Sequence, residues 1–283
     1  MKNALGIAPE RSLPKLTKKT FSKWYKTNRI NNEDEKKRTV YLFIDEFTDY
    51  NDPEIAKISY KLLTSLGYHV VIPKHVESGR AQISKGMLRD AQAIAKKNIK
   101  FLKDIITEEN PLIGIEPSAI LTFREEYIDL LRGEKKEAAK IISKNVFTVE
   151  EFLSKESENG KIHKVLFTKE EKKIKLHGHC QEKAIASTKD SINILSLPVN
   201  YFVEEIPSGC CGMAGSFGYE KEHYEISMKI GEQILFPSVR EAKNDYIICA
   251  AGTSCRHQIK DGTSVRAFHP VEILYDALLV KNE

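Results

Sequence analysis

The distribution of cysteines constrains this chain more than any other feature. All five cysteines of the 283-residue sequence lie at or after residue 180, and they fall in three short segments: Leu-His-Gly-His-Cys (176–180), Ser-Gly-Cys-Cys-Gly (208–212) and Cys-Ala-Ala-Gly-Thr-Ser-Cys (249–255). Cysteines that only filled a hydrophobic core would be expected on both sides of residue 180. An adjacent pair between two glycines suits a thiolate site, because glycine lets the backbone approach a bound metal or cluster closely.

A disulfide framework is the first alternative, but five is an odd number for one. Residues 1–7 lack the apolar core of an export signal, so we expect a cytoplasmic protein whose thiols stay reduced. The cysteines therefore predict a metal or iron–sulfur site, with structural or incidental cysteines as the alternative. The expected ligands are Cys180, Cys210, Cys211 and Cys255. Cys249 lies inside an apolar strand and is expected to be a buried thiol.

Composition places the chain among soluble globular proteins, with 41% hydrophobic and 30% charged residues. Its 44 basic and 40 acidic residues leave a net charge of only +4, which gives no argument for nucleic-acid binding. No apolar run is long enough to span a bilayer.

Strand and helix patterns alternate along most of the sequence, which is typical of α/β proteins with parallel sheets. Buried strands are predicted at 39–45, 68–73 and 112–115 in the first half, and at 173–178, 199–204 and 245–250 in the second. We expect an N-terminal arm over 1–38 with a charged linker at its end, a first repeat lobe over 39–145, a connector over 146–171 and a second repeat lobe over 172–283.

The loops of the two lobes align with each other. Glu77-Ser78-Gly79 stands where the second lobe has Cys210-Cys211-Gly212, and counting along the chain makes Phe47 and Ala119 the counterparts of Cys180 and Cys255. This predicts an internal duplication of about 110 residues, in two pseudo-symmetric Rossmann-like lobes. The first copy contains no cysteine.

These motifs resemble the Cys-Cys-Gly cysteine-rich domain, which occurs in the B subunit of heterodisulfide reductase, in iron–sulfur subunits of glycolate oxidase and anaerobic glycerol-3-phosphate dehydrogenase, and in lactate-utilisation proteins. From residue 38 onward, the chain resembles the C-terminal part of fused FAD-linked oxidases of D-2-hydroxy acids such as D-lactate, glycolate and D-2-hydroxyglutarate. The runs that carry this resemblance are LFIDEFTDYNDPEIA, ESGRAQISKGMLRDA, GIEPSAILTFREEY, LHGHCQEKA, GCCGMAGSFGYEKEHYEISMKIGE and GTSCR.

The sequence departs from the family pattern in two ways. The family has five cysteines per repeat, ending in Cys-x-x-Cys, whereas Gly252 stands three residues before Cys255 here. The chain also has no Gly-rich dinucleotide signature, so the resemblance implies an FAD on a partner domain or subunit. It further implies other iron–sulfur modules as partners.

Several other residues are candidates for supporting or substrate-binding roles. His177 and His179 flank Cys180 and could be ligands, proton donors or supporting groups, or ordinary loop histidines; Arg256 could pair with an anionic substrate or cluster. In the first lobe Glu77 and Arg80 occupy loops at the sheet edge where α/β proteins bind ligands, or form a solvated rim.

Four thiolates fit a [4Fe–4S] cluster, and zinc is the alternative. The resemblance adds to the case for iron and implies an electron-transfer module of an FAD-linked 2-hydroxy-acid oxidoreductase that passes electrons from flavin to a further acceptor. A disulfide or thiol reductase and a zinc-stabilised binding protein are the other hypotheses.

Overall fold

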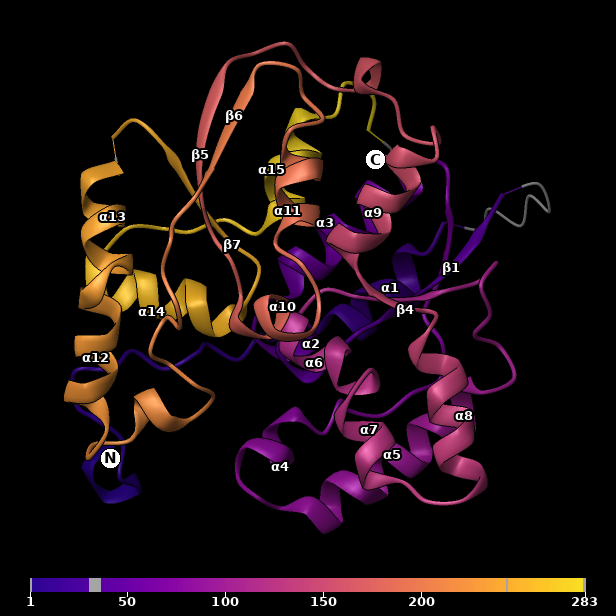
Figure 1. Ribbon diagram of the computed structural model, residues 1–283, viewed down its shortest axis with the longest axis horizontal. Coiled ribbons are helices and arrows are strands. Elements are labelled where there is room, and N and C mark those ends of the chain that lie inside the picture. Colours follow the sequence, from indigo (N-terminus) through magenta and orange to yellow (C-terminus); the bar gives the residue numbers. More distant parts are fainter. Residues whose placement is uncertain (1, 31–36, 243, 282–283) are drawn as a thin grey trace.

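Two parallel β-sheets organise the chain (Figure 1). The computed structural model describes residues 2–30, 37–242 and 244–281, so most of the expected charged linker at 31–38 lies outside the described residues. The first sheet has the order β2-β1-β3-β4 and the second the order β6-β5-β7. Their bounds are β1 (Thr39–Phe43), β2 (His69–Val71), β3 (Leu112–Gly114), β4 (Val146–Thr148), β5 (Lys172–His177), β6 (Tyr201–Glu205) and β7 (Ile247–Ala250). The expected α/β class with two parallel-sheet lobes is confirmed.

In both sheets, the first strand of the repeat lies between the second and the third. β1 lies between β2 and β3, and β5 lies between β6 and β7, in each case with parallel pairing. Phe43 pairs with Gly114 at the end of β1, and His177 pairs with Ala250 at the end of β5. Because parallel strands end at one edge, the loops that follow each set of strands gather at that edge.

The first sheet extends beyond the boundary expected from sequence. Residues 146–148, which the sequence assigned to a connector, pair with β3 as β4 and lead directly into α9 (Val149–Glu158). By its sequence pattern alone, the segment 149–153 suits only a short amphipathic turn. A capping box explains the longer helix, because the Thr148 hydroxyl accepts from the backbone of Glu151 while the Glu151 carboxylate accepts from the backbone of Thr148.

The second repeat ends in the same way. Phe268 forms a parallel bridge to Cys249 of β7, and His269 then caps α15 (Pro270–Ala277) with a capping box to Glu272. The segments that follow the third strand of each repeat are therefore equivalent, with Thr148 in the place of His269. The duplication includes α9 and α15, which the sequence spacing alone did not indicate.

Four helices exchange partners between the repeats. α15 of the second repeat packs against α3 (Pro53–Ser65) of the first, and α9 of the first packs against α11 (Lys189–Leu195) of the second. One hydrophobic core runs through this layer and includes Leu62, Phe152, Ile194 and Leu274. The two sheets are thus joined by shared apolar burial, the dominant favourable contribution to folding.

The remaining helices pack on the sheets or follow the loops at the ends of the strands. They are α1 (Phe21–Asn28), α2 (Glu46–Tyr50), α4 (Arg80–Ser84), α5 (Leu88–Leu102), α6 (Pro117–Ile120), α7 (Glu126–Leu130), α8 (Glu134–Ser143), α10 (Cys180–Ile185), α12 (Tyr224–Gln233), α13 (Leu235–Ala242) and α14 (Thr253–Thr263), with 3₁₀ turns at Lys2–Leu5, Leu121–Phe123, Lys164–Leu166 and Phe217–Tyr219. No helix within the described residues is both long and apolar enough to cross a membrane.

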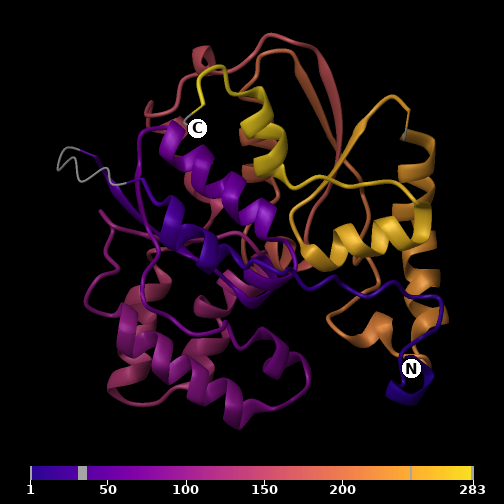
Figure 2. The same ribbon diagram turned by 180° about the vertical axis from the view of Figure 1, so that it is seen from behind.

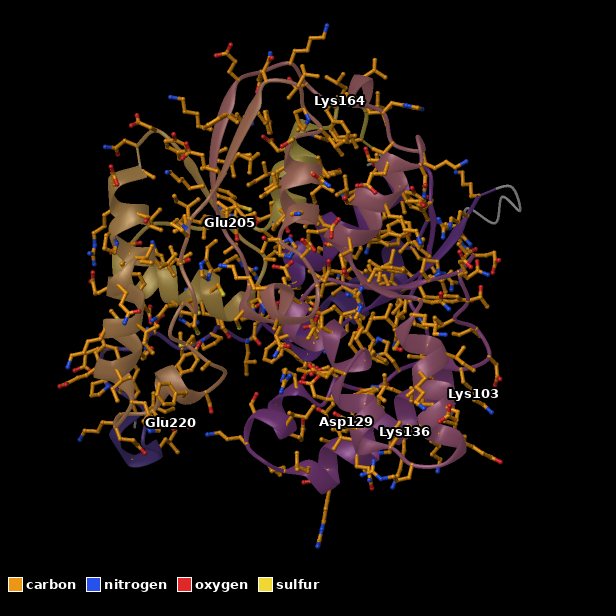
Figure 3. The ribbon with its side chains drawn as sticks, viewed as in Figure 1. Lys103, Asp129, Lys136, Lys164, Glu205 and Glu220 are labelled. Atoms are coloured by element: carbon orange, nitrogen blue, oxygen red, sulfur yellow. The ribbon has the colours of Figure 1, made fainter. Side chains whose placement is uncertain are left out.

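The sequence from Cys180 to Leu195 has the pattern of a single helix, but the structure has two. The chain breaks after Ile185, where the Ser187 hydroxyl accepts from the Lys189 N–H and Thr188 donates to the carboxylate of Glu205 over 3.1 Å. Glu205 lies at the end of β6 and is labelled in Figure 3. Side-chain bonds of this kind compete with helical hydrogen bonds, so they end α10 and redirect the chain into α11.

The N-terminal arm crosses from the second lobe to the first, as Figure 2 shows. Its anchor is Arg11, which is fully buried and donates to the carbonyl of Gly218 over 2.6 Å and to the hydroxyl of Ser227 over 2.7 Å. Farther along, Thr17 donates its backbone N–H to the carbonyl of Tyr50 in the first lobe. The arm therefore forms hydrogen bonds with both lobes.

Candidate metal centre

Three loops at the C-terminal edge of the second sheet bring four cysteines together. Cys180 follows β5 and is the first residue of α10, Cys210 and Cys211 follow β6, and Cys255 lies in the first turn of α14 after β7. Cys211 and Cys255 are buried, Cys210 is half-buried and Cys180 is exposed. α10 begins at Cys180 and α14 begins two residues before Cys255, so the N-terminal N–H groups of both helices favour negative charge there.

The four thiols form a chain of contacts. Hydrogen bonds from Cys180 and Cys211 lower the pKa of Cys210 to about 2, and the Gly212 N–H donates to the same sulfur over 3.3 Å. A hydrogen bond with Cys211 lowers the pKa of Cys255 well below its usual value, with a further lowering by His177 that opposes the effect of burial. The bond to Cys210 in turn raises the pKa of Cys180 and of Cys211. The lowered pKa values favour the thiolate form at Cys210 and Cys255, which is the form that binds metals.

Two glycines leave room for this arrangement. Gly212 has a φ of +94°, and a Cβ there would lie 2.3 Å from the carbonyl oxygen of Ser227. A Cβ on Gly252 would lie 2.3 Å from Cδ2 of His179 and 3.4 Å from Sγ of Cys255. The imidazole of His179 thus fills the space beside Gly252. Gly252 is the position at which the Cys-x-x-Cys pattern described above would have a further cysteine.

His177 and His179 have different environments. His177 ends β5, is buried, and hydrogen-bonds through Nδ1 to the hydroxyl of Ser208 at 2.7 Å. One of its ring nitrogens lies with the sulfurs of Cys211 and Cys255 in a group whose atoms are all within 4.8 Å of one another, a geometry that could hold a metal ion. His179 instead caps α10 through Nδ1, and its Nε2 lies 3.8 Å from the carboxylate of Glu116.

The other expected residues lie outside the thiol cluster. Cys249 is fully buried in β7 within the core shared by the lobes, and burial raises the pKa of its thiol. Arg256 points to the first lobe, where it pairs with Asp52 at 2.6 Å. The carboxylate of Glu77 accepts from Gln82 at 3.4 Å, and Arg80 pairs with Glu126. The structure therefore gives Arg256 a role in joining the lobes.

A cavity of about 580 Å³ adjoins the thiols and lies between the lobes. The four cysteines and His179 line one side, and Phe47, Arg80 and Lys85 of the first lobe line the other. Lys85 also pairs with Glu220 of the second lobe, the residue labelled beside the 3₁₀ turn at Phe217–Tyr219 in Figure 3. The exposed thiol of Cys180 is therefore reached through a space that both repeats enclose.

The first repeat has polar residues where the second has cysteines. Asp45 caps α2 as His179 caps α10, so the helix-opening residue Glu46, and not Phe47, is the counterpart of Cys180. Counting residues missed this by one position, because the loops between strands differ in length. Ser78 matches Cys211, and both its N–H and its hydroxyl donate to the Glu46 carboxylate over 2.8 Å. A carboxylate–serine pair thus occupies the position of two thiols.

Buried carboxyl groups lie at the same junction of the lobes. Burial, with the nearby charges of Glu46 and Glu116, raises the pKa of Asp45 to about 8. Burial also raises the pKa of Glu150 to about 8 and that of Glu182 well above its usual value. Glu150 and Glu182 were not identified from sequence. The spacing His179-x-x-Glu182 was the available signal, since it fits a capping box.

Comparisons with known proteins agree with this architecture. Residues 174–260 match the family model described as the cysteine-rich domain, CCG. The chain is 30% identical to D-2-hydroxyglutarate dehydrogenase of Escherichia coli strain K12 over 250 residues, which is 87% of this chain and 23% of that protein. It is 27% identical over 277 residues to the C subunit of the anaerobic glycerol-3-phosphate dehydrogenase of the same strain, and this match spans 97% of this chain and 68% of that relative.

The D-2-hydroxyglutarate dehydrogenase of Haemophilus influenzae gives the same picture, with 27% identity over 86% of this chain and 24% of that protein. The chain thus spans about a quarter of the length of the D-2-hydroxyglutarate dehydrogenases it matches. Residues 174–260 are therefore similar to the cysteine-rich domain family, in a chain that is similar along most of its length to parts of these dehydrogenases.

Proposed function

We propose that the chain is an iron–sulfur electron-transfer part of an FAD-linked 2-hydroxy-acid dehydrogenase, which takes electrons from a flavin on another domain or subunit and passes them to a further acceptor. The observation that carries the proposal is the contact chain from Cys180 through Cys210 and Cys211 to Cys255. Four soft thiol ligands at one sheet edge fit the usual ligand count of a [4Fe–4S] cluster.

The surroundings of the thiols also suit a cluster. Such a cluster, when bound, supplies one-electron redox chemistry at a potential that depends on ligands, hydrogen bonds and solvent exposure. The Gly212 N–H already points at a cluster-facing sulfur, and the N-termini of α10 and α14 favour the negative charge of a thiolate-ligated group. The exposed side at Cys180 gives a route for electrons to a partner.

The similarity to longer dehydrogenases supports a partner that carries the substrate chemistry. Because the chain spans only 23% of the E. coli D-2-hydroxyglutarate dehydrogenase, the flavin and the hydroxy-acid site belong to another domain or subunit in this proposal. Further iron–sulfur modules would then complete the path to the acceptor. The substrate of the whole assembly is a 2-hydroxy acid in this proposal.

Protein produced and reconstituted without oxygen tests the cluster directly. We expect about four iron and four sulfide per chain, with broad visible absorption that decreases on reduction. Mixing the reduced flavin partner with the oxidised protein should then bleach this absorption in a single turnover. A colourless protein that holds one zinc would contradict the proposal and support a structural site.

A second candidate function, reduction of a small disulfide or thiol compound, is favoured by one specific observation. The exposed thiol of Cys180 borders the cavity of about 580 Å³, which is large enough for a small molecule. Reduced protein that is reoxidised by a small disulfide, but not by a flavin partner, would favour this candidate over the electron-transfer role.

A further inference from the structure

One carboxylate of the first repeat contacts both helices that begin at the thiol centre. Glu116 follows β3 and is 3% exposed. One of its oxygens accepts from the backbone N–H of Thr253, the first residue of α14, over 2.7 Å. The other lies 3.8 Å from Nε2 of His179, the N-cap residue of α10. Glu116 therefore reaches the start of the helix that carries Cys180 and the start of the helix that carries Cys255.

The duplication explains how Glu116 reaches the second repeat. Glu116 and Gly252 each stand two residues after the third strand of their repeat, and each is the N-cap residue of the following helix. α6, which Glu116 caps, packs against α10, as Figure 1 shows. Because Gly252 has no side chain, the ring of His179 occupies the space that a Cβ would fill, and there it approaches the Glu116 carboxylate.

Glu116 supplies a hydrogen-bond acceptor that Gly252 cannot. The first N–H groups of a helix have no partner within the helix and need an acceptor from outside it. At α6 the Glu116 carboxylate accepts from the N–H of Ser118 over 3.3 Å and from its hydroxyl over 2.7 Å. At α14 the same carboxylate accepts from Thr253. It thus caps one helix in each repeat.

The charge of Glu116 has no basic partner other than the nearby His179. Within the described residues, neither lysine nor arginine pairs with Glu116. Asp52, also from the first repeat, accepts from the Thr253 hydroxyl over 3.0 Å, but it is paired with Arg256 at 2.6 Å. The side chain of Asp52 is 30% exposed and that of Glu116 only 4%, so water screens Asp52 far more. Glu116 is therefore the carboxylate whose charge acts most strongly on the start of α14.

We propose that Glu116 is a positioning residue of the thiol centre, which holds the starts of α10 and α14 so that Cys180 and Cys255 face the bound group, and whose negative charge lowers the reduction potential of a cluster held there. The inference rests on the proposed function and gives the cysteine-free repeat a part in it. A buried carboxylate opposes the addition of an electron to a nearby anionic cluster, because like charges repel strongly where water does not screen them.

Two substitutions separate the charge of Glu116 from its reach. Glu116→Gln keeps the length of the side chain and an oxygen for the Thr253 N–H but removes the charge. We expect the midpoint potential of the reconstituted full chain to rise, with iron content near that of the parent. Potentiometric titration followed by visible absorption measures this shift.

Glu116→Asp keeps the charge, but its side chain is one methylene shorter and should lose the bond to Thr253. We expect iron to be released to a chelator faster than from the parent by on the order of tenfold, the low end of the effect of changing groups that orient metal ligands. Timed release under anaerobic conditions measures the rate.

Glu156→Gln is the matched control. Glu156 is also a carboxylate of the first repeat and also 3% exposed, but it bonds to Arg38 at 2.5 Å and to Tyr68 at 2.8 Å. These residues immediately precede β1 and β2, so Glu156 lies at the opposite edge of the sheet from the thiols. This variant should lose stability but keep the parent potential and the parent rate of iron release.

The outcomes separate the two proposals. A midpoint potential unchanged in Glu116→Gln, or an iron release rate unchanged in Glu116→Asp, overturns the inference and leaves the electron-transfer role standing. A parent protein that binds no iron–sulfur cluster contradicts the proposed function instead. Binding of Co²⁺ alone, followed by its thiolate charge-transfer absorption, then measures the positioning role. Glu116→Asp should bind Co²⁺ about tenfold more weakly than Glu156→Gln, and equal affinities overturn the inference.

Discussion

Glu46 and Cys180 occupy the same place in the two repeats, since each is the first residue of the helix that follows the central strand of its sheet. In the second repeat the thiol of Cys180 contacts Cys210, and in the first the Glu46 carboxylate accepts two hydrogen bonds from Ser78. The duplicated scaffold therefore holds a thiol cluster in one copy and a hydrogen-bonded carboxylate–serine pair in the other. The cavity lies between the two copies.

Substitution of the paired cysteines should abolish cluster binding. In Cys210→Ser and Cys211→Ser, a hard oxygen replaces a soft thiolate, so we expect iron content and visible absorption to fall to background after anaerobic reconstitution. Cys249→Ser is the matched control, because this thiol lies in the core and not at the sheet edge. Retention of the full iron content in Cys211→Ser would show that the ligand set has been assigned wrongly.

The polar pair of the first repeat should stabilise the fold. Ser78→Ala removes a buried hydroxyl that donates to Glu46 over 2.8 Å, so we expect the free energy of unfolding to fall by about 1–3 kcal/mol in a denaturant titration. Ser143→Ala, at the exposed end of α8, should change it by less than about 0.5 kcal/mol. Equal effects of the two changes would argue against a structural role for the pair.

The buried carboxyl of Asp45 should make stability depend on pH. Its pKa rises from 3.8 to about 8 on folding, mainly through burial, so between these values the folded state holds a proton that the unfolded state has lost. Stability from this group therefore falls as pH rises from about 4 to about 8 and changes little above that.

Asp45→Asn removes this pH dependence and can keep the caps that Asp45 makes to the N–H groups of Phe47 and Thr48. We expect the variant to be more stable than the parent at pH 7 by at least about 1.4 kcal/mol, the value of one pKa unit. Chemical unfolding at pH 5, 6, 7 and 8 measures the difference. A parent protein and variant with parallel pH profiles would contradict the shifted pKa.

The ion pair between Lys85 and Glu220 should restrict access to the thiols. The pair joins Lys85, which follows α4 of the first lobe, to Glu220, which follows the 3₁₀ turn of the second, and Lys85 lines the cavity that Cys180 borders. Lys85→Gln should therefore raise the rate at which an alkylating reagent modifies Cys180 in the metal-free protein, by roughly two- to fivefold, while stability changes by less than about 1 kcal/mol.

Lys140→Gln provides the control, because Lys140 forms a similar exposed pair with Glu137 on α8, away from the cavity. Peptide mass analysis after timed alkylation identifies which cysteine has reacted. If Lys85→Gln and Lys140→Gln react at the parent rate, the Lys85–Glu220 pair does not limit entry.

Sequence determined the local chemistry and the class of fold. The alternation of strands and helices, the glycines beside Cys210 and Cys211, and the absence of cysteine before residue 180 are all properties of short segments, so they can be identified without a structure. Strand and helix periods and the conformational freedom of glycine act over a few residues. For this reason the parallel sheets and the Cys-Cys-Gly motif were predicted correctly.

Tertiary structure alone decided the features that depend on contacts between distant segments. The bridge from Phe268 to Cys249 and the packing of α15 on α3 showed that the duplication includes α9 and α15. Helix capping, and not residue counting, identified Glu46 as the residue of the first repeat that is equivalent to Cys180. The burial of His177 beside the sulfurs of Cys211 and Cys255 likewise arises only when β5, β6 and β7 bring their ends together, because burial is a property of the packed chain and not of the residue.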